Sequence, residues 1–164
     1  ELDKENYNKW LEFVSPEDKE IMLNMSEEEK KECFTDTLTF GTAGIRGILG
    51  PGTNKMNIYT VRKASEAFAR YILENINNPL ERGIVVAHDN RMMSREFCLE
   101  SAKVFAAHGI KTYIFDSLRP TPELSYAVRE LKAAGVDMTK PEAIEKAIQM
   151  FDEIIDEFSE LYFS

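Results

Sequence analysis

Residues 83–134 alternate two kinds of segment, and this alternation constrains the fold more than any other feature of the chain. GIVVAHD (83–89) and IKTYIFDS (110–117) are short apolar runs with β-branched residues, which are typical of buried strands. SREFCLESAKVFAAHG (94–109) and TPELSYAVRELKAA (121–134) carry apolar residues at helical spacing. Because strands that alternate with helices usually pair in parallel, the sequence predicts an α/β fold with a mixed, mostly parallel sheet covered by helices.

Residues at the ends of the predicted helices fit this assignment. Ser94 is expected to cap the N-terminus of its helix, and Gly109 is expected to end it. Thr121 is the predicted N-cap of the next helix, with Pro122 in the first turn, where its missing N–H costs nothing. Another helix precedes the first strand, and Asn57 is its predicted cap. The apolar face of that helix would comprise Ile58, Val61, Ala64, Phe68, Tyr71 and Ile72.

Helices are also predicted at both ends of the chain. Short helices are expected within residues 4–35, where Ser15 and Ser26 each precede carboxylates that suit a helix N-terminus. Their buried side would comprise Trp10, Leu11, Phe13, Ile21, Met22 and Phe34. Residues 139–162 are predicted to form a C-terminal amphipathic helix, and we interpret its acidic residues as a solvated face rather than a metal site.

The chain length fits one α/β domain over residues 40–164, preceded by a helical extension over residues 1–39. The formal net charge of -9 argues against a nucleic-acid partner, because that binding depends on cations set against phosphates. Residues 1–40 and 135–164 carry net charges of -7 and -6, whereas residues 41–134 carry +4. This cationic centre favours a small anionic ligand, and an uneven solvated surface explains it equally well.

The compartment is predicted from three features. No apolar run reaches the roughly 18 residues that a membrane span requires, so no membrane partner is expected. The acidic and polar start does not resemble a signal peptide. Cys33 and Cys98 have neither the spacing of a disulfide framework nor that of a zinc site. We therefore expect reduced thiols and a cytoplasmic location.

Glycine is concentrated in one segment, FGTAGIRGILGPG (40–52), which holds five of the eight glycines around a single cation, Arg46. The segment is not a P-loop, because no Gly-Lys-Ser/Thr follows, and its glycine spacing differs from the dinucleotide fingerprint. Bare backbone N–H groups can approach an anion closely, and a guanidinium can hold phosphate oxygens through its planar fork. The alternative interpretation is a set of turns with positive φ and an arginine that points into water.

Polar residues follow the predicted strands, at the sheet edge where α/β proteins bind ligands. His88 is a candidate general base, although a packed or capping role is favoured. Asp89 and Arg91 are expected to pair within a turn, and Arg91 is also a second candidate for contact with an anion. The helix dipole explains His108 without a function. The sequence shows no nucleophile placed beside a general base, such as Ser-His-Asp or Cys-His, and no cluster of carboxylates that could bind a metal. It therefore predicts no catalytic residue and no metal ligand in this chain.

Three ordered segments carry a resemblance to a known family. They are FGTAGIRGILGPGTNKMNIYTVRKA (40–64), VVAHDNRMMSREF (85–97) and RPTPELSYAVREL (119–131). Together they resemble the N-terminal domain of the phosphohexomutases, the phosphoglucomutase/phosphomannomutase family, and with Trp10 they are most similar to its longer phosphoglucomutase-like branch. The resemblance implies a four-domain enzyme in which a phosphoserine exchanges its phosphoryl group with a sugar phosphate through a bisphosphate, assisted by Mg²⁺.

The resemblance also implies roles for individual residues. The arginine of the Thr-Ala-Gly-Ile-Arg-Gly segment lies beside the phosphoserine in the family, and this position corresponds to Arg46. Thr42 and Gly44 would line the same wall of the substrate site. Arg91 and Ser94 match an Asp-x-Arg-x-Ser turn of the family, which we interpret as mainly structural. The candidate substrate-binding residues are therefore Arg46, Thr42, Gly44 and Arg91, and the implied partner is a sugar phosphate.

After residue 134 the chain departs from the family pattern. It reads GVDMTKPEAIEKA (135–147) where the family has a strand and a Thr-Ala-Ser-His-Asn-Pro loop with the nucleophilic serine. We therefore expect a fragment or engineered first domain that is inactive alone and has no cofactor, with Mg²⁺ needed by the full-length enzyme. A natural truncated relative and an incomplete sequence are the alternatives. A different hypothesis is a non-catalytic interaction module that binds a partner through the acidic helix 139–162.

Overall fold

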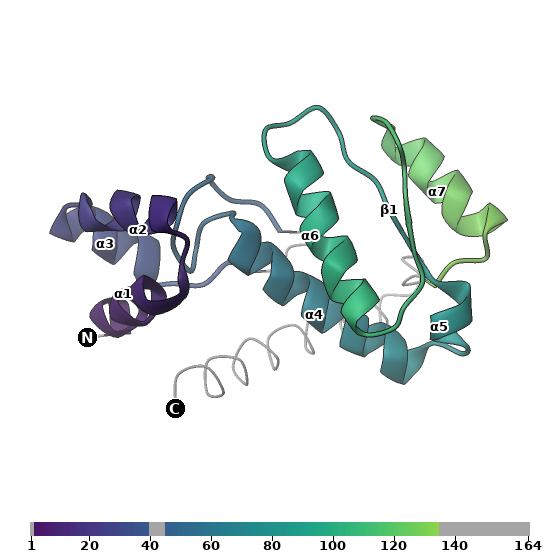
Figure 1. Ribbon diagram of the computed structural model, residues 1–164, viewed down its shortest axis with the longest axis horizontal. Helices are drawn as coiled ribbons and strands as arrows, with labels where there is room; N and C mark the ends of the chain where they lie inside the picture. The colour runs from purple at the N-terminus through teal and green to yellow at the C-terminus, as the bar shows by residue number, and fades with distance from the viewer. Residues whose placement is uncertain (1, 40–44, 135–164) are drawn as a thin grey trace. The chain divides into compact units, whose positions relative to one another are not determined.

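The computed structural model describes residues 2–39 and 45–134, and Figure 1 shows their path. The chain divides into two compact units, with the boundary between Thr60 and Val61. The helices of the first unit are α1 (Leu2–Phe13), α2 (Pro16–Leu23) and α3 (Glu27–Phe34). The later elements are α4 (Ile58–Asn75), α5 (Pro79–Arg82), β1 (Ile84–Val86), α6 (Ser94–Ala107), β2 (Thr112–Ile114) and α7 (Thr121–Glu130).

Helices α1, α2 and α3 confirm the predicted N-terminal helices, and local capping explains where two of them begin. The Ser15 hydroxyl accepts a hydrogen bond from the backbone N–H of Asp18 at the start of α2. Ser26 and Glu29 form a reciprocal capping box at the start of α3. Each contact satisfies a helix N–H group that has no partner inside the helix.

An aromatic cluster forms the core of the first unit. Trp10, Met22 and Phe34 are buried as predicted, and the rings of Trp10 and Phe34 pack edge to face with centroids 5.6 Å apart. Phe13 and Ile21 were wrongly assigned to this core, because they are 47% and 52% exposed. Phe13 ends α1 and covers one side of Trp10, whereas α2 is short and turns Met22 rather than its neighbour Ile21 inward.

The second unit contains the predicted parallel sheet. Strand β1 pairs with β2 in parallel, with Ile84 opposite Thr112 and Val86 opposite Ile114. Helices α6 and α7 both contact β1, and Figure 1 shows β1 between them. The buried core of this unit comprises Ala69, Tyr71, Ile72, Ile84, Phe105, Ile110 and Ala134. This arrangement confirms the α/β fold class.

Helix α4 supplies much of this core, and it begins as predicted. The side-chain oxygen of Asn57 accepts a hydrogen bond of 2.9 Å from the N–H of Thr60, as expected of an N-cap. Tyr71 and Ile72 are buried. The remaining predicted core positions of this helix, Ile58, Val61, Ala64 and Phe68, are half-buried.

The predicted end of α6 is confirmed, but two predicted N-caps are wrong by one residue. Gly109 has φ +73°, and its N–H and that of Ile110 bond back to the last turn of α6, as in a Schellman motif. Ser94 is the first residue of α6 and Met93 precedes it as the cap, because the Ser94 hydroxyl is used by the N–H of Asp89. Helix α7 likewise begins at Thr121, after Pro120, whose carbonyl accepts the first bonds of the helix.

Three expectations fall outside this description. The C-terminal amphipathic helix 139–162, and the interaction module based on it, lie outside the described residues. The boundary between residues 39 and 40 stays a prediction, because residues 40–44 also lie outside the described residues.

Within residues 2–39 and 45–134, no helix has the length and apolar character needed to cross a membrane.

Candidate functional site

The described part of the glycine segment is a closed loop tied to the start of α4. The N–H of Met56 donates to the carbonyl of Ile48 at 2.8 Å, and the N–H of Gly50 donates to the carbonyl of Met56 at 3.1 Å. Leu49 and Met56 form an isolated bridge at the same place. The backbone that follows Arg46 is therefore paired with the residues that lead into α4.

The buried side chain of Asn57 forms hydrogen bonds with the same loop. Asn57 is only 9% exposed, and its amide nitrogen lies within hydrogen-bond distance of three loop carbonyls. The distances are 2.9 Å to Gly50, 3.0 Å to Gly52 and 3.2 Å to Lys55. The sequence analysis predicted Asn57 only as a helix cap, since the contact with the glycines depends on the path of the loop. An asparagine shortly after two glycines is the only local signal that would have suggested it.

Two glycines of the loop are needed where the backbone comes close to other groups. Gly52 has φ +139°, and a Cβ atom there would lie 2.6 Å from the carbonyl oxygen of Cys33. A Cβ atom at Gly47 would lie 2.9 Å from the Leu38 side chain and 3.4 Å from that of Met56. The distance to the Cys33 backbone is too short for a side chain without movement of the backbone, whereas the flexible end of Leu38 could move away from a side chain at Gly47. The interpretation of this segment as turns with positive φ is therefore correct for Gly50 and Gly52.

Arg46 is exposed at the beginning of this loop. No hydrogen bond or ion pair connects its guanidinium to residues 2–39 or 45–134. The neighbouring Ile48 is 71% exposed. The described loop thus has a hydrogen-bonded backbone from Ile48 onward and an exposed cation at its beginning. Thr42 and Gly44, which were predicted to share the site, lie outside the described residues.

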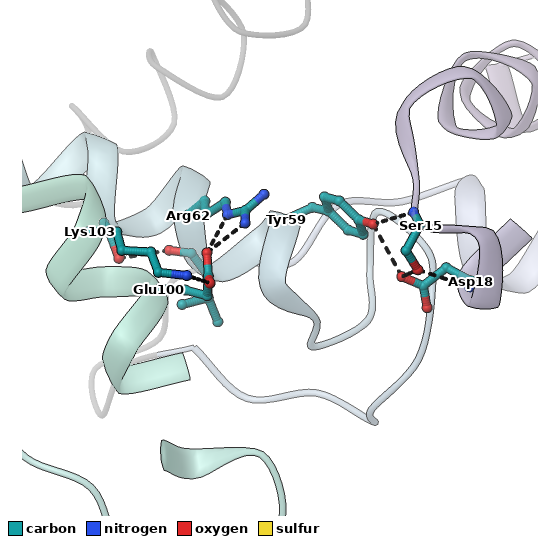
Figure 2. A network of polar contacts seen from close by, with 8 residues as sticks. Ser15, Asp18, Tyr59, Arg62, Glu100 and Lys103 are labelled. Atoms are coloured by element: carbon teal, nitrogen blue, oxygen red, sulfur yellow. Dashed lines mark hydrogen bonds and ion pairs between the residues drawn. The ribbon is translucent and has the colours of Figure 1, made fainter. Parts of the chain in front are cut away.

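The first turn of α4 also anchors the N-terminal helices. The Tyr59 hydroxyl accepts a bond of 2.8 Å from the backbone N–H of Ser15 and donates one of 3.2 Å to the Asp18 carboxylate (Figure 2). The Tyr59 ring packs edge to face against Trp10 and Phe13. Asn57 and Tyr59 therefore connect the glycine loop and the helical extension to one helix start.

In the second unit, the turn between β1 and α6 contains the predicted pair. Arg91 donates to the Asp89 carboxylate from its side chain at 2.7 Å and from its backbone N–H at 3.0 Å. The backbone bond from Arg91 is the largest cause of a lowered pKa for Asp89. Burial opposes this shift, and the contacts with Ser94 and the Arg91 guanidinium add to it. The Arg91 side chain is still 83% exposed. Its bond to Asp89 confirms the predicted pairing of these two residues within the turn.

An ion pair between α4 and α6 joins these two helices. Glu100 on α6 accepts from Arg62 on α4 at 2.6 Å and from Lys103 at 2.5 Å (Figure 2). The bond from Lys103 is the largest cause of a lowered pKa for Glu100, and burial opposes it. The bond from Arg62 therefore connects α4 to the middle of α6, the helix that begins at Ser94.

The two histidines occupy different environments. His88 is 8% exposed, and its Nδ1 atom is buried without a hydrogen-bond partner among the described residues. This burial agrees with the favoured prediction of a packed residue. His108 lies 2.6 Å from the Glu66 carboxylate, which also accepts from Arg70 at 2.8 Å. Burial raises the pKa of Glu66, but the bonds from His108 and Arg70 outweigh it and the net shift is downward. The sequence analysis missed Glu66.

The described residues offer no metal centre. No three His, Cys, Asp or Glu side chains gather within the described parts of the chain. Cys33 and Cys98 are both free and buried, and burial raises the pKa of each thiol. The absence of a disulfide at Cys33 and Cys98 agrees with the predicted reduced state.

These features define the class of protein: an α/β domain with a bonded glycine loop that presents one arginine. The sequence model of the family described as "Phosphoglucomutase/phosphomannomutase, alpha/beta/alpha domain I" matches residues 37–141. The chain therefore belongs to the phosphoglucomutase/phosphomannomutase family, and it corresponds to domain I of that family. The predicted resemblance is confirmed.

Individual relatives support the same assignment. A phosphoglucomutase of Staphylococcus epidermidis is 41% identical over 134 residues, covering 80% of this chain and 24% of the relative. Phosphoglucomutases of Staphylococcus saprophyticus and Staphylococcus aureus are 39% and 43% identical, over 79% and 74% of this chain and 23% and 22% of their own length. The chain thus spans about a quarter of these curated relatives. No solved structure shows a significant match.

Proposed function

We propose that this chain is the first domain of a phosphoglucomutase-type enzyme, which interconverts sugar 1-phosphates and 6-phosphates by phosphoserine-mediated phosphoryl transfer. The observation that carries the proposal is the match to domain I over residues 37–141, which includes Arg46 and its loop. Because the chain spans about 24% of a matching phosphoglucomutase, the activity would belong to the longer protein. The chain alone would be inactive.

Arg46 is the proposed contact to the phosphoryl group. A guanidinium offers two parallel N–H donors to phosphate oxygens and offsets the charge that builds up on them during transfer. The exposure of Arg46 supports this role, since its donors are not used by the described residues. The bonded loop beneath it would keep the arginine in place without a large loss of conformational entropy on binding. Thr42 and Gly44 would contact the same group.

Arg91 is proposed as a second, weaker contact. Its guanidinium is exposed, but it already donates to Asp89, so an anionic ligand would compete with that carboxylate. Mg²⁺ stays a prediction for the longer enzyme. Because no ligand cluster for it is found within the described residues, no step that uses the metal is assigned to them.

Titration of the 164-residue chain with glucose 1,6-bisphosphate tests the proposal. Loss of the charge-assisted bonds in Arg46→Ala should weaken binding by about 10- to 100-fold. Arg129→Ala removes another exposed arginine, on α7, and is the matched control that should bind as the wild type does. A coupled phosphoglucomutase assay with Mg²⁺ should show no turnover. Turnover by this chain, or equal binding by the Arg46 variant and the wild type, would refute the proposal.

A further inference from the structure

Asn57 has more hydrogen bonds than a helix cap requires. Its side-chain oxygen accepts from the N–H of Thr60, and its own backbone N–H donates to the Thr60 hydroxyl at 3.1 Å. These two contacts complete the cap at the start of α4. The amide nitrogen is not needed for the cap, yet it is directed to the carbonyls of Gly50, Gly52 and Lys55.

These carbonyls belong to the loop that presents Arg46. The N–H of Gly50 is bonded to Met56, so the carbonyl contact with Asn57 fixes the same residue from its other side. The carbonyl of Ile48, two residues after Arg46, is held by the N–H of Met56. Because Met56 and Asn57 are adjacent, Ile48 and Gly50 are both tied to one dipeptide at the start of α4.

The burial of Asn57 makes these bonds important. A buried amide group that loses its partners keeps its desolvation cost, and three loop carbonyls would lose a donor at the same time. Gly50 and Gly52 both have positive φ, a conformation that glycine leaves at little cost. Thr53, Asn54 and Lys55 are also bonded to residues 32–38, whereas the carbonyls of Gly50 and Gly52 are held by the Asn57 amide. The glycine part of the loop therefore depends on Asn57 for its conformation.

We infer that Asn57 is a positioning residue, whose side-chain amide fixes the glycine loop and thereby the place of Arg46. The part of this inference that concerns the anion rests on the proposed function. The part that concerns the conformation of the loop is independent of it. A serine at this position would keep an oxygen for the Thr60 N–H, and serine is a good N-cap. It is too short to reach the loop carbonyls. Asn57→Ser therefore separates the two roles of the residue.

Two measurements on the 164-residue chain test the inference. The first is limited trypsin cleavage after Arg46, because a loosened loop is cut faster. The second is the affinity for glucose 1,6-bisphosphate. Ser26→Ala is the matched control, since it removes a helix cap in α3 without touching the loop. Circular dichroism and urea unfolding establish that both variants are folded.

In Asn57→Ser, cleavage after Arg46 should be about tenfold faster and binding about fivefold weaker, as expected for the loss of a local clamp. Ser26→Ala should change both by less than about twofold. Cleavage unchanged in Asn57→Ser would overturn the inference, as would faster cleavage with unchanged binding. If the wild-type chain binds no bisphosphate, the proposed function fails, and the cleavage rate alone decides whether Asn57 fixes the loop. Asn57→Asp, which keeps the size and the cap oxygen, serves as the second variant and should also be cleaved faster.

Discussion

Substitution of Gly52 by alanine should destabilise the first unit because of two separate effects. The backbone at this position has φ +139°, which side chains rarely adopt, and this strain costs about 1–3 kcal/mol. The added Cβ would also lie 2.6 Å from the Cys33 carbonyl oxygen. Because that oxygen is backbone and cannot rotate away, the crowding should add about 1–3 kcal/mol.

Gly50→Ala separates these two effects. Gly50 has φ +150°, but a Cβ there would meet no atom within 4 Å. The two variants therefore share the conformational strain and differ in the close approach to Cys33. We expect both to be less stable than the wild type, and Gly52→Ala to be the less stable of the two by about 1–3 kcal/mol.

Urea unfolding followed by tryptophan fluorescence measures this difference. Trp10 is the only tryptophan of the chain, and it is buried in the same cluster as Cys33. Its emission therefore reports on the unit that contains the substitution. Equal free energies of unfolding for the two variants, or a stable Gly52→Ala, would refute the argument from close approach.

Two other substitutions test contacts that join distant parts of the chain. Tyr59→Phe keeps the ring against Trp10 but removes the hydrogen bonds to Ser15 and Asp18. The free energy of unfolding should therefore fall by about 1–3 kcal/mol. An unchanged urea midpoint would contradict this prediction. Because the pKa of Glu66 is lowered in the folded state, its ionised form stabilises the fold above about pH 4.5, and this contribution is lost as the pH falls through the lower folded pKa. Glu66→Gln should therefore lower stability by about 1 kcal/mol at pH 7, and this loss should shrink progressively as the pH falls below about 4.5. A loss that does not change with pH would refute the assignment.

The fold was predictable where the signal is local. The N-cap at Ser26 and the glycine that ends α6 each depend on residues within one helical turn, so sequence spacing is sufficient. The parallel pairing of β1 and β2 follows from the helix between them. The shifted starts of α6 and α7 show the limit of this approach, because Ser94 has a competing partner in Asp89.

The candidate site was predictable in composition but not in geometry. The concentration of glycines around Arg46 marked residues 40–52 as a loop suited to an anion. The bonds from Asn57 to Gly50 and Gly52 could not be predicted, because they depend on how the loop closes. Contacts such as Tyr59 with Ser15 join residues 44 positions apart, and no periodicity indicates them.

The central claim is that the guanidinium of Arg46 contacts a phosphoryl group, and NMR of its Nε–Hε resonance tests this most directly. We predict that this resonance shifts progressively on titration with glucose 1,6-bisphosphate and stays in place with uncharged glucose. The Arg129 resonance should not move in either titration. An Arg46 resonance that is unmoved by saturating bisphosphate would contradict the claim.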